Sequence, residues 1–213
     1  MTIDSKELTI FDHIGNRIVT EDREINIIAK FEEPLIVILG DVLSDEECEQ
    51  LVLLSKDKMN RSKIGKSHEV NEIRTSSSMF FQDSENDLIT KLEKRISSIM
   101  NIPAEHGDGV QILKYTPGQE YKAHFDFFTS KSKEIKNNRI STIIIYLNDV
   151  EQGGETFFPK LNLSISPRKG MAVYFEYFYN DQTINELTLH GGAPVIEGEK
   201  WVATQWMRRQ KIE

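Results

Sequence analysis

The pattern of hydrophobic and polar positions changes about halfway along the chain, from helical spacing to short β-like runs. Residues 1–33 are charged and only weakly patterned, which predicts an N-terminal arm or an edge element. The apolar positions of this arm are Ile25, Ile27, Ile28 and Phe31. The continuous apolar run over 35–39, between Pro34 and Gly40, is typical of a short buried strand.

Two segments with helical spacing follow this strand. Ser44 and Glu47 fit a capping box, so a helix should begin there and run to about Lys58. Its buried stripe is expected at Cys48, Leu51, Val52, Leu54 and Ser55. A second helix should start within 84–87 and end at Pro103. Its apolar positions are Leu88, Ile89, Leu92, Ile96 and Ile99.

The remaining segments predict loops and strands. Residues 60–75 are polar and without a period, which predicts a long loop of the kind that often carries function. SSMFF, which follows, has the composition of a strand. Further short β-like runs are VQILKY, RISTIIIYLN, ETFFP, LNLSIS, MAVYFEY, ELTLHGG and KWVATQWMRR. Helices first and many short strands afterwards predict an α+β chain, a jelly roll with helices on one face.

Composition and charge narrow the class of protein. The net charge is −8, from 34 acidic and 26 basic side chains, which argues against nucleic acid because phosphate binding needs a positive surface. No apolar run approaches the ~18 residues of a membrane span. The mixed, acidic N-terminus does not resemble a signal peptide. A single cysteine, Cys48, favours a reducing compartment, so we expect a cytoplasmic protein without a membrane or nucleic-acid partner.

Two of the five histidines belong to a candidate metal site. His124 and Asp126 stand at i and i+2, so in an extended segment both side chains point to the same face. His190 ends a strand-like run before two glycines. A His-x-Asp pair with a distant histidine is the two-histidine, one-carboxylate arrangement that suits Fe(II). The pair alone is a weak signal, and a structural role is an equal alternative for His190. The other histidines, expected at the surface, are His13, His68 and His106.

Lys200 and Tyr115 are candidates for binding an anion beside this metal site. Lys200 lies ten residues after His190 and could enter the same cavity if its strand returned antiparallel beside that of His190. A buried lysine is costly unless it meets an anion, and Tyr115 offers a phenolic hydroxyl to the same anion. Together, the metal triad, the lysine and the tyrosine predict a pocket for a small dicarboxylate that chelates iron. The alternative for Lys200 is a solvated residue at a strand start.

The segments that carry these residues resemble the prolyl 4-hydroxylase family of Fe(II)/2-oxoglutarate dioxygenases. They are RTSSSMF, VQILKYTPGQEYKAHFDFF, RISTIIIYLNDVEQGGETFFP, LHGGAPV and GEKWVATQWMR, within residues 74–208. The resemblance implies a double-stranded β-helix, which is a jelly roll, with supporting N-terminal helices. It divides the chain into an arm over 1–33, a support region over 34–106 and a dioxygenase core over 107–209. Residues 34–209 would form a single catalytic domain.

The resemblance also assigns roles in catalysis. The Fe(II) ligands would be His124, Asp126 and His190. Lys200 would pair with the distal carboxylate of 2-oxoglutarate, and Tyr115 and Thr156 would hydrogen-bond this carboxylate. Trp206 would lie near the metal and the target ring. The residues that would face a peptide groove are Arg74, Ser76, Asp108 and Arg139. The loops 60–75 and 129–138 would cover that groove.

The reaction implied is hydroxylation of peptidyl proline at C4, in proline-rich or collagen-like peptides. It consumes O2 and 2-oxoglutarate, releases succinate and CO2, and uses L-ascorbate to restore oxidised iron. Aromatic candidates for docking the peptide are Tyr121, Phe127, Tyr146 and Trp206, although Phe127 and Tyr146 are more typical of core residues. Asp126 favours hydroxylation, because related halogenases replace this carboxylate with a small residue.

Three alternatives stay open at this point. The first is a 2-oxoglutarate dioxygenase with another substrate. The second is a cupin-like module that holds Zn²⁺ in the same His/Asp/His site. The third is a β-sandwich interaction protein without a metal. The apolar residues of the N-terminal arm could form a homodimer interface or pack on the core.

Overall fold

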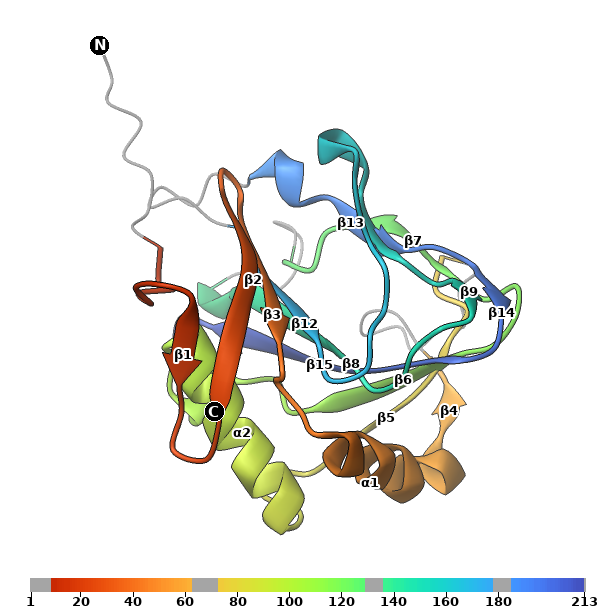
Figure 1. Ribbon diagram of the computed structural model, residues 1–213, viewed down its shortest axis with the longest axis horizontal. Coiled ribbons are helices and arrows are strands. Elements are labelled where there is room, and N and C mark those ends of the chain that lie inside the picture. Colours follow the sequence, from red (N-terminus) through yellow and green to blue (C-terminus); the bar gives the residue numbers. More distant parts are fainter. Residues whose placement is uncertain (1–8, 63–72, 129–135, 178–184, 213) are drawn as a thin grey trace.

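A computed structural model describes residues 9–62, 73–128, 136–177 and 185–212. Two antiparallel sheets face each other, with two helices packed against the outer face of the larger one (Figure 1). The larger sheet contains β1 (Arg17–Val19), β2 (Glu24–Glu32), β3 (Leu35–Gly40), β12 (Ala172–Glu176), β8 (Arg139–Tyr146), β15 (Lys200–Arg208), β6 (Gln111–Tyr115), β5 (Ser77–Phe80) and β4 (Asn60–Arg61), in that order. The smaller sheet contains β11 (Leu163–Ile165), β10 (Thr156–Phe158), β13 (His190–Gly192) and β7 (Tyr121–His124). A separate pair joins β14 (Val195–Glu197) to β9 (Gln152–Gly153).

The first helix, α1 (Asp45–Ser55), begins at the predicted capping box. Ser44 Oγ accepts a hydrogen bond from the Glu47 backbone, and the Glu47 carboxylate accepts one from the Ser44 backbone. The short 3₁₀ turn η1 (Lys56–Lys58) carries the chain to the predicted end. The predicted buried stripe is wrong at Leu54, which is 41% exposed, because it lies one position off the i, i+3, i+7 row of buried residues.

The second helix, α2 (Asp87–Met100), also lies where the pattern predicts it. It is capped at Asn86, whose side chain accepts a hydrogen bond from the Ile89 backbone, and Asn101 ends it in the left-handed conformation with φ 51°. Ser84, offered as a start signal, instead donates to the carboxylate of Glu93. The predicted apolar positions face the core, with Leu88 only partly buried.

The N-terminal segment forms the edge of the larger sheet. Strands β1 and β2 pair with each other, and β2 pairs with β3 over nearly its whole length. Ile25 of β2 is fully buried, whereas Ile28 and Phe31 are exposed. The expected edge element is therefore present, and part of its apolar side packs on the core.

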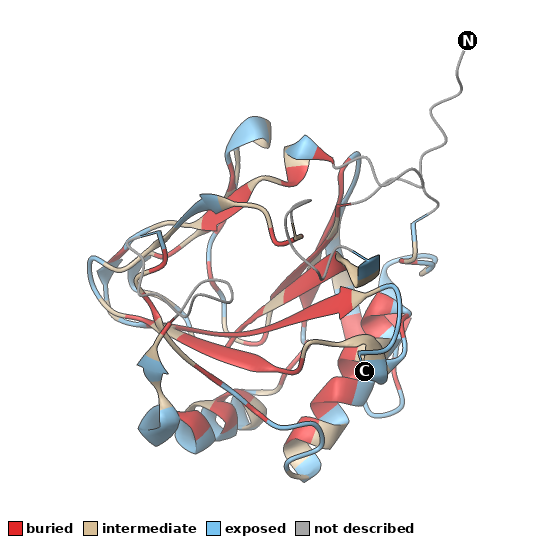
Figure 2. Ribbon diagram, turned by 180° about the vertical axis from the view of Figure 1, so that it is seen from behind, coloured by how far each residue is buried: buried red, intermediate tan, exposed pale blue. Residues whose placement is uncertain are grey.

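Each central strand of the larger sheet is apolar on both faces. In β12, Ala172 and Tyr174 join the core under the helices, whereas Val173 and Phe175 join a second core between the two sheets. The burial colouring shows the central strands buried and the inner sides of both helices buried against them (Figure 2). Continuous apolar runs such as 35–39 follow from this double burial.

One predicted strand is shorter than expected. The first part of ELTLHGG forms the 3₁₀ turn η5 (Glu186–Thr188), where the Asn185 side chain accepts a hydrogen bond from the Leu187 backbone, and only β13 is extended. Two further 3₁₀ turns are η2 (Ala104–His106) and η4 (Pro159–Leu161). The other predicted strands are confirmed.

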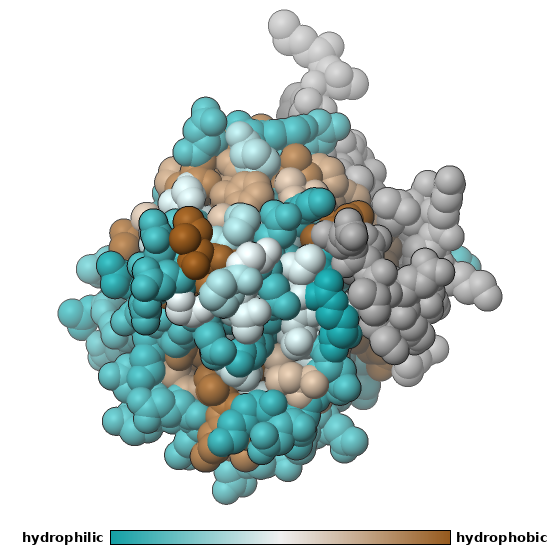
Figure 3. All heavy atoms as spheres, turned by 90° about the vertical axis from the view of Figure 1, so that its right-hand side faces the viewer, coloured by the Kyte–Doolittle hydropathy of each residue, from teal (hydrophilic) through white to brown (hydrophobic). Residues whose placement is uncertain are grey.

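The side of the molecule shown in Figure 3 has no single extended apolar patch among its described residues. On the side that carries β9 and β14, hydrophilic side chains dominate and hydrophobic ones lie in small separate groups (Figure 3). Scattered apolar residues of this kind are ordinary on a protein surface. No helix in the described part of the chain is long and apolar enough to span a membrane.

Candidate metal centre

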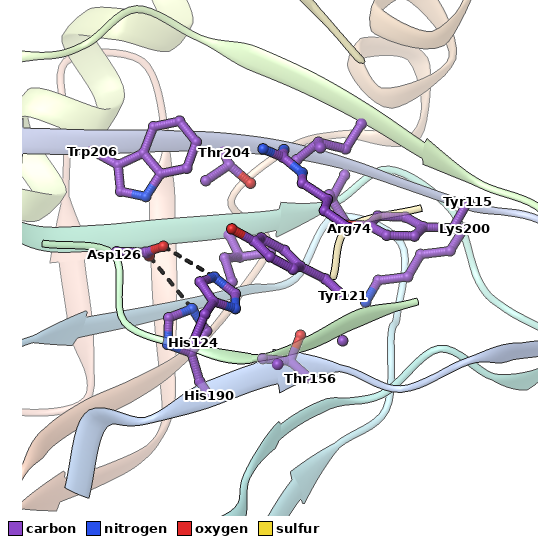
Figure 4. Close-up of a pocket in the computed structure, with 15 residues that line it drawn as sticks. Arg74, Tyr115, Tyr121, His124, Asp126, Thr156, His190, Lys200, Thr204 and Trp206 are labelled. Carbon is purple, nitrogen blue, oxygen red and sulfur yellow. Dashed lines mark ion pairs between the residues drawn. The ribbon is translucent and has the colours of Figure 1, made fainter. Parts of the chain in front are cut away.

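Neighbouring strands of the smaller sheet bring two histidines together. His124 is the last residue of β7 and His190 the first of β13, and the two are paired in register with ring centroids 4.5 Å apart. Asp126 does not continue the strand as expected, because β7 ends at His124 and the chain bends. The bend still carries the carboxylate to both imidazoles (Figure 4). The three potential ligand atoms lie within 4.8 Å of one another.

The hydrogen bonds of the two imidazoles fix their tautomers. His124 Nδ1 lies 2.9 Å from the Lys122 carbonyl, and His190 Nδ1 lies 3.0 Å from the Thr188 carbonyl. A carbonyl can only accept, so each Nδ1 carries the proton and each Nε2 keeps a lone pair. These lone pairs face the carboxylate oxygens of Asp126 at 3.2 and 3.4 Å. Two imidazole nitrogens and a carboxylate so close together are a donor set that a divalent metal fits.

The electrostatics of the cluster favour the same protonation states. Burial, together with the neighbouring His190, lowers the pKa of His124, so the ring is neutral at physiological pH. Burial by itself raises the pKa of Asp126, but the attraction of His190 and hydrogen bonds from both histidines, in their proton-bearing forms, hold this pKa well below its usual value. A neutral His124 and an ionised Asp126 are the forms in which these two side chains ligate metals.

Lys200 enters the same pocket from the opposite sheet. The expectation that its strand runs beside that of His190 is wrong, since β15 lies in the larger sheet and β13 in the smaller one. The two residues instead line one pocket between the sheets (Figure 4). Lys200 is 4% exposed and forms no ion pair with any described carboxylate. Burial lowers the pKa of its ammonium group to about 8.

The closed end of the pocket around Lys200 is polar and aromatic. The Lys200 ammonium lies 5.6 Å from the ring centroid of Tyr115 and 5.7 Å from that of Tyr146. The Tyr146 hydroxyl donates to Thr156 Oγ1 at 2.7 Å. Tyr115 and Thr156 line the pocket with Lys200. A buried cation that lies against two aromatic rings and forms no ion pair with a described carboxylate is suited to an anionic ligand.

The residues proposed for a peptide groove divide into two groups. Arg74 and Trp206 line the pocket, and each has a buried nitrogen without a hydrogen-bond partner, Arg74 Nε and Trp206 Nε1. Ser76, Asp108 and Arg139 are not among the pocket-lining residues.

The second group has partners within the protein. Ser76 bonds the Ser62 hydroxyl at 2.8 Å, and Asp108 is held between Arg139 and Arg208. Arg139 also stacks on the Trp206 ring, 4.0 Å from its centroid, and donates to the Asp126 carbonyl.

Several other expectations can be placed in the structure. Tyr121 lines the pocket and stacks on His124 with ring centroids 3.5 Å apart, whereas Phe127 and Tyr146 belong to the core between the sheets. His13 is not a free surface residue, because its Nε2 bonds the Ile99 carbonyl at 2.9 Å. The parts of the expected covering loops at 63–72 and 129–135, including His68, lie outside the described residues.

Two polar residues beside the candidate metal centre, Thr142 and Tyr177, were not among the candidates from the sequence. Thr142 donates to the carboxylate of Asp126, and the Tyr177 hydroxyl contacts that of Thr142. Both stand in runs that read as ordinary buried strands, RISTIIIYLN and MAVYFEY. The only local signal was a polar group at a position that the strand pattern assigns to the core.

Two facing antiparallel sheets with a two-histidine, one-carboxylate centre between them define a jelly-roll protein with a mononuclear metal site. A family model described as the 2OG-Fe(II) oxygenase superfamily matches residues 110–208. In Arabidopsis thaliana, "Probable prolyl 4-hydroxylase 3" is 38% identical over 82% of this chain and 69% of its own length. "Prolyl 4-hydroxylase 5" is 36% identical over 82% of this chain and 68% of its own length.

A solved prolyl hydroxylase structure is also similar to this chain. The viral collagen prolyl hydroxylase of Paramecium bursaria Chlorella virus 1, in its 2OG complex, has a TM-score of 0.68 and 31% identity to this chain. The match covers 81% of this chain and 95% of that one. The chain belongs to the prolyl 4-hydroxylase family of the 2OG-Fe(II) oxygenases. This confirms the expected family, the jelly roll and a dioxygenase that depends on Fe(II) and 2-oxoglutarate.

Proposed function

We propose that the protein hydroxylates peptidyl proline at C4, with 2-oxoglutarate as cosubstrate. The observation that carries the proposal is the pocket between the sheets, which has the metal centre on one side and the unpaired ammonium group of Lys200 on the other. A dianion that chelates the metal at one end and meets Lys200 at the other would satisfy both. The proline substrate is supported by relatives that are named prolyl 4-hydroxylases.

Each pocket residue then has a defined task. The metal would be held by His124, Asp126 and His190. Lys200 would bind the distal carboxylate of 2-oxoglutarate, and the hydroxyl groups of Tyr115 and Thr156 would orient that carboxylate. Bound Fe(II) would supply the activation of O2. The walls formed by apolar residues such as Leu113 and Val202 would keep water from the reacting centre.

The peptide would meet the open donors of the same pocket. Arg74 Nε and Trp206 Nε1 are buried and unpartnered, so a carbonyl oxygen of a bound peptide would satisfy them. Tyr121 and Trp206 offer aromatic faces of the kind on which the polyproline conformation docks. Asp108, Arg139 and Ser76 would act on the peptide groove only indirectly, since they bond to other protein groups.

Several finer expectations belong to the same proposal. L-ascorbate would restore iron that is oxidised in unproductive turnovers. The support region over 34–106 and the core over 107–209 would form a single catalytic domain over 34–209, preceded by the arm over 1–33. A cytoplasmic location, a possible homodimer and the absence of nucleic-acid and membrane partners stay predictions. Light scattering of the purified protein would decide the oligomeric state.

The decisive experiment is a hydroxylation assay on a defined peptide. The protein would be loaded anaerobically with Fe(II), then given 2-oxoglutarate, ascorbate, air and a Pro-Pro-Gly repeat peptide. Tandem mass spectrometry should show one added oxygen at C4 of proline, absent with the His124→Ala variant. Succinate without a modified peptide would point to a dioxygenase with another substrate. Neither product from folded, iron-loaded protein would contradict the proposal and favour a zinc-binding or binding-module role.

A further inference from the structure

A chain of buried hydroxyl groups leads from the interior of the larger sheet to the carboxylate of the metal centre. Thr142, in the middle of β8, is fully buried, and its Oγ1 lies 2.7 Å from Asp126 Oδ2. The Tyr177 hydroxyl, just past the end of β12, lies 3.0 Å from the same Oγ1. Neither residue lines the pocket or belongs to the metal ligands.

The inventory of protons fixes the direction of both hydrogen bonds. An ionised carboxylate can only accept, so the single hydroxyl proton of Thr142 is donated to Asp126. The contact between Thr142 and Tyr177 must then use the proton of Tyr177. Burial and the nearby charge of Asp126 raise the pKa of Tyr177 well above its usual value, so the phenol keeps that proton. The order of donation is Tyr177 to Thr142 to Asp126.

The surroundings hold this chain of hydrogen bonds in one geometry. Tyr177 is 1% exposed, and its ring packs between those of Phe127 and Phe175 at centroid distances of 6.2 and 5.9 Å. Thr142 is β-branched and lies on the central strand β8, which restricts its side chain to few rotamers. Buried hydroxyl groups in such a site cannot exchange their partners for water.

We propose that Thr142 and Tyr177 are positioning residues that fix the orientation of the Asp126 carboxylate for metal binding. An aspartate carboxylate otherwise rotates in a broad, shallow well about its last torsion. The bond from Thr142 to Oδ2 holds the plane of the carboxylate, so that Oδ1 stays turned towards His124 and Oδ2 towards His190, where the three side chains would hold the metal. Tyr177 acts through Thr142, by fixing the orientation of its hydroxyl group. The inference rests on the proposed function only in that it assumes a metal at this site.

The test compares the metal affinity of variants with that of the native chain. Co(II) would serve as the probe, because it binds the same ligands as Fe(II) and its visible absorption reports coordination geometry. Thr142→Val removes the hydroxyl group and should weaken Co(II) binding by about 10- to 100-fold, the usual effect of losing an outer-shell partner. Thr142→Ser keeps the hydroxyl group and should restore most of the affinity. Tyr177→Phe should weaken binding less than Thr142→Val.

Two further variants separate positioning from general packing. If Tyr177 acts through Thr142, the double variant Thr142→Val/Tyr177→Phe should bind Co(II) no more weakly than Thr142→Val alone. Tyr174→Phe is the matched control, because Tyr174 is a buried tyrosine of β12, three residues before Tyr177, whose hydroxyl donates to Glu176 instead of Thr142. It should lose some thermal stability and keep native Co(II) affinity.

The outcomes distinguish this inference from the proposed function. Unchanged Co(II) affinity in folded Thr142→Val protein would overturn the inference, even if the native chain hydroxylates proline. Equal weakening by Tyr174→Phe, or no recovery with Thr142→Ser, would overturn it as well. A native chain that binds Co(II) in the expected variant order but leaves the proline peptide unmodified would support the inference while contradicting the proposed substrate.

Discussion

The support layer beneath the larger sheet and the pocket between the two sheets each bury a cation, but only one of these cations has carboxylate partners. Arg95 of α2 is 2% exposed and contacts Asp22 at 2.6 Å and Glu47 at 2.7 Å. It also donates to the Val42 carbonyl at 2.8 Å. Lys200 is 4% exposed and has no ion pair among the described residues.

The difference shows what each layer is built for. Arg95 ties α2 to the N-terminal hairpin and to α1, so its charge is satisfied by the fold itself. Lys200 has no ion pair among the described residues, although the charge of Glu155 acts on it, so an anion that enters the pocket would give it a close partner. The cores around the two cations also differ in composition. The core under the helices is mainly aliphatic, and the core between the sheets is rich in aromatic residues. A buried charge with partners indicates structure, and one without partners indicates binding.

The largest effect is expected when the paired cation is removed. Arg95→Met leaves Asp22 and Glu47 without their principal partner, and should lower the free energy of unfolding by about 3 kcal/mol. This is the low end of the usual cost, because the Asp22 side chain is 31% exposed and Arg23 still contacts Glu47. Urea denaturation followed by circular dichroism would measure it. An unchanged midpoint would show that Arg95 is not a structural residue.

A surface ion pair provides the control for this prediction. Arg17 and Glu24 lie on opposite strands of the N-terminal hairpin, with both side chains 62% exposed. Arg17→Met should change the free energy of unfolding by less than ~1 kcal/mol, because exposed ion pairs contribute little. A loss as large as that of Arg95→Met would mean that burial is not what separates the two pairs.

Removing the unpaired cation, Lys200, should stabilise the ligand-free protein, whereas removing Arg95 should destabilise it. Lys200→Met should weaken 2-oxoglutarate binding to the metal-loaded protein by roughly 10- to 150-fold, the value of about 1.5–3 kcal/mol for a hydrogen bond to a charged group. The same substitution should raise the stability of the ligand-free protein, because it removes a buried charge without a partner. Isothermal titration calorimetry and thermal denaturation would measure the two effects. Native affinity in the variant would place the cosubstrate elsewhere.

The smallest expected effect is a pH dependence that Lys200 alone produces. Burial holds the pKa of Lys200 at about 8, below its usual 10.5. Above pH 8 the ligand-free pocket loses its positive charge, so affinity for 2-oxoglutarate should fall by up to about tenfold per pH unit. Calorimetric titrations from pH 7 to 9.5 should show this fall in the native chain and not in Lys200→Met. A parallel fall in both would assign the effect to another group.

The same pKa shift fixes the sign of the stability effect. Between about pH 8 and 10.5 the unfolded chain keeps the lysine proton that the folded, ligand-free protein has lost. The unfolded state therefore binds more protons, and stability contributed by this site rises with pH over that range. Lys200→Met should lack the rise.

Local signals in the sequence were enough to predict most of the elements and to select the candidate metal ligands that the structure brings together. The capping box at Ser44 and the helical spacing after Asp87 depend only on neighbouring residues, which is why both helices begin close to where they were expected. The strand runs were read from β-branched and aromatic composition in the same way. Two predictions from the local pattern were wrong. Leu54 is exposed because it lies slightly off the buried row of its helix, and the segment Glu186–Thr188 forms the turn η5 instead of a strand because the Asn185 side chain caps it.

Residue type, order and family resemblance were enough to select the candidate site residues, which are His124, Asp126, His190 and Lys200. The tertiary structure alone decided how they meet. His190 and Lys200 lie on opposite sheets rather than on neighbouring strands, and Asp126 reaches the imidazoles through a bend. The bonds from Tyr177 through Thr142 to Asp126 join residues from three separate segments. Such contacts depend on how distant strands stack, and no local pattern of side chains encodes that arrangement.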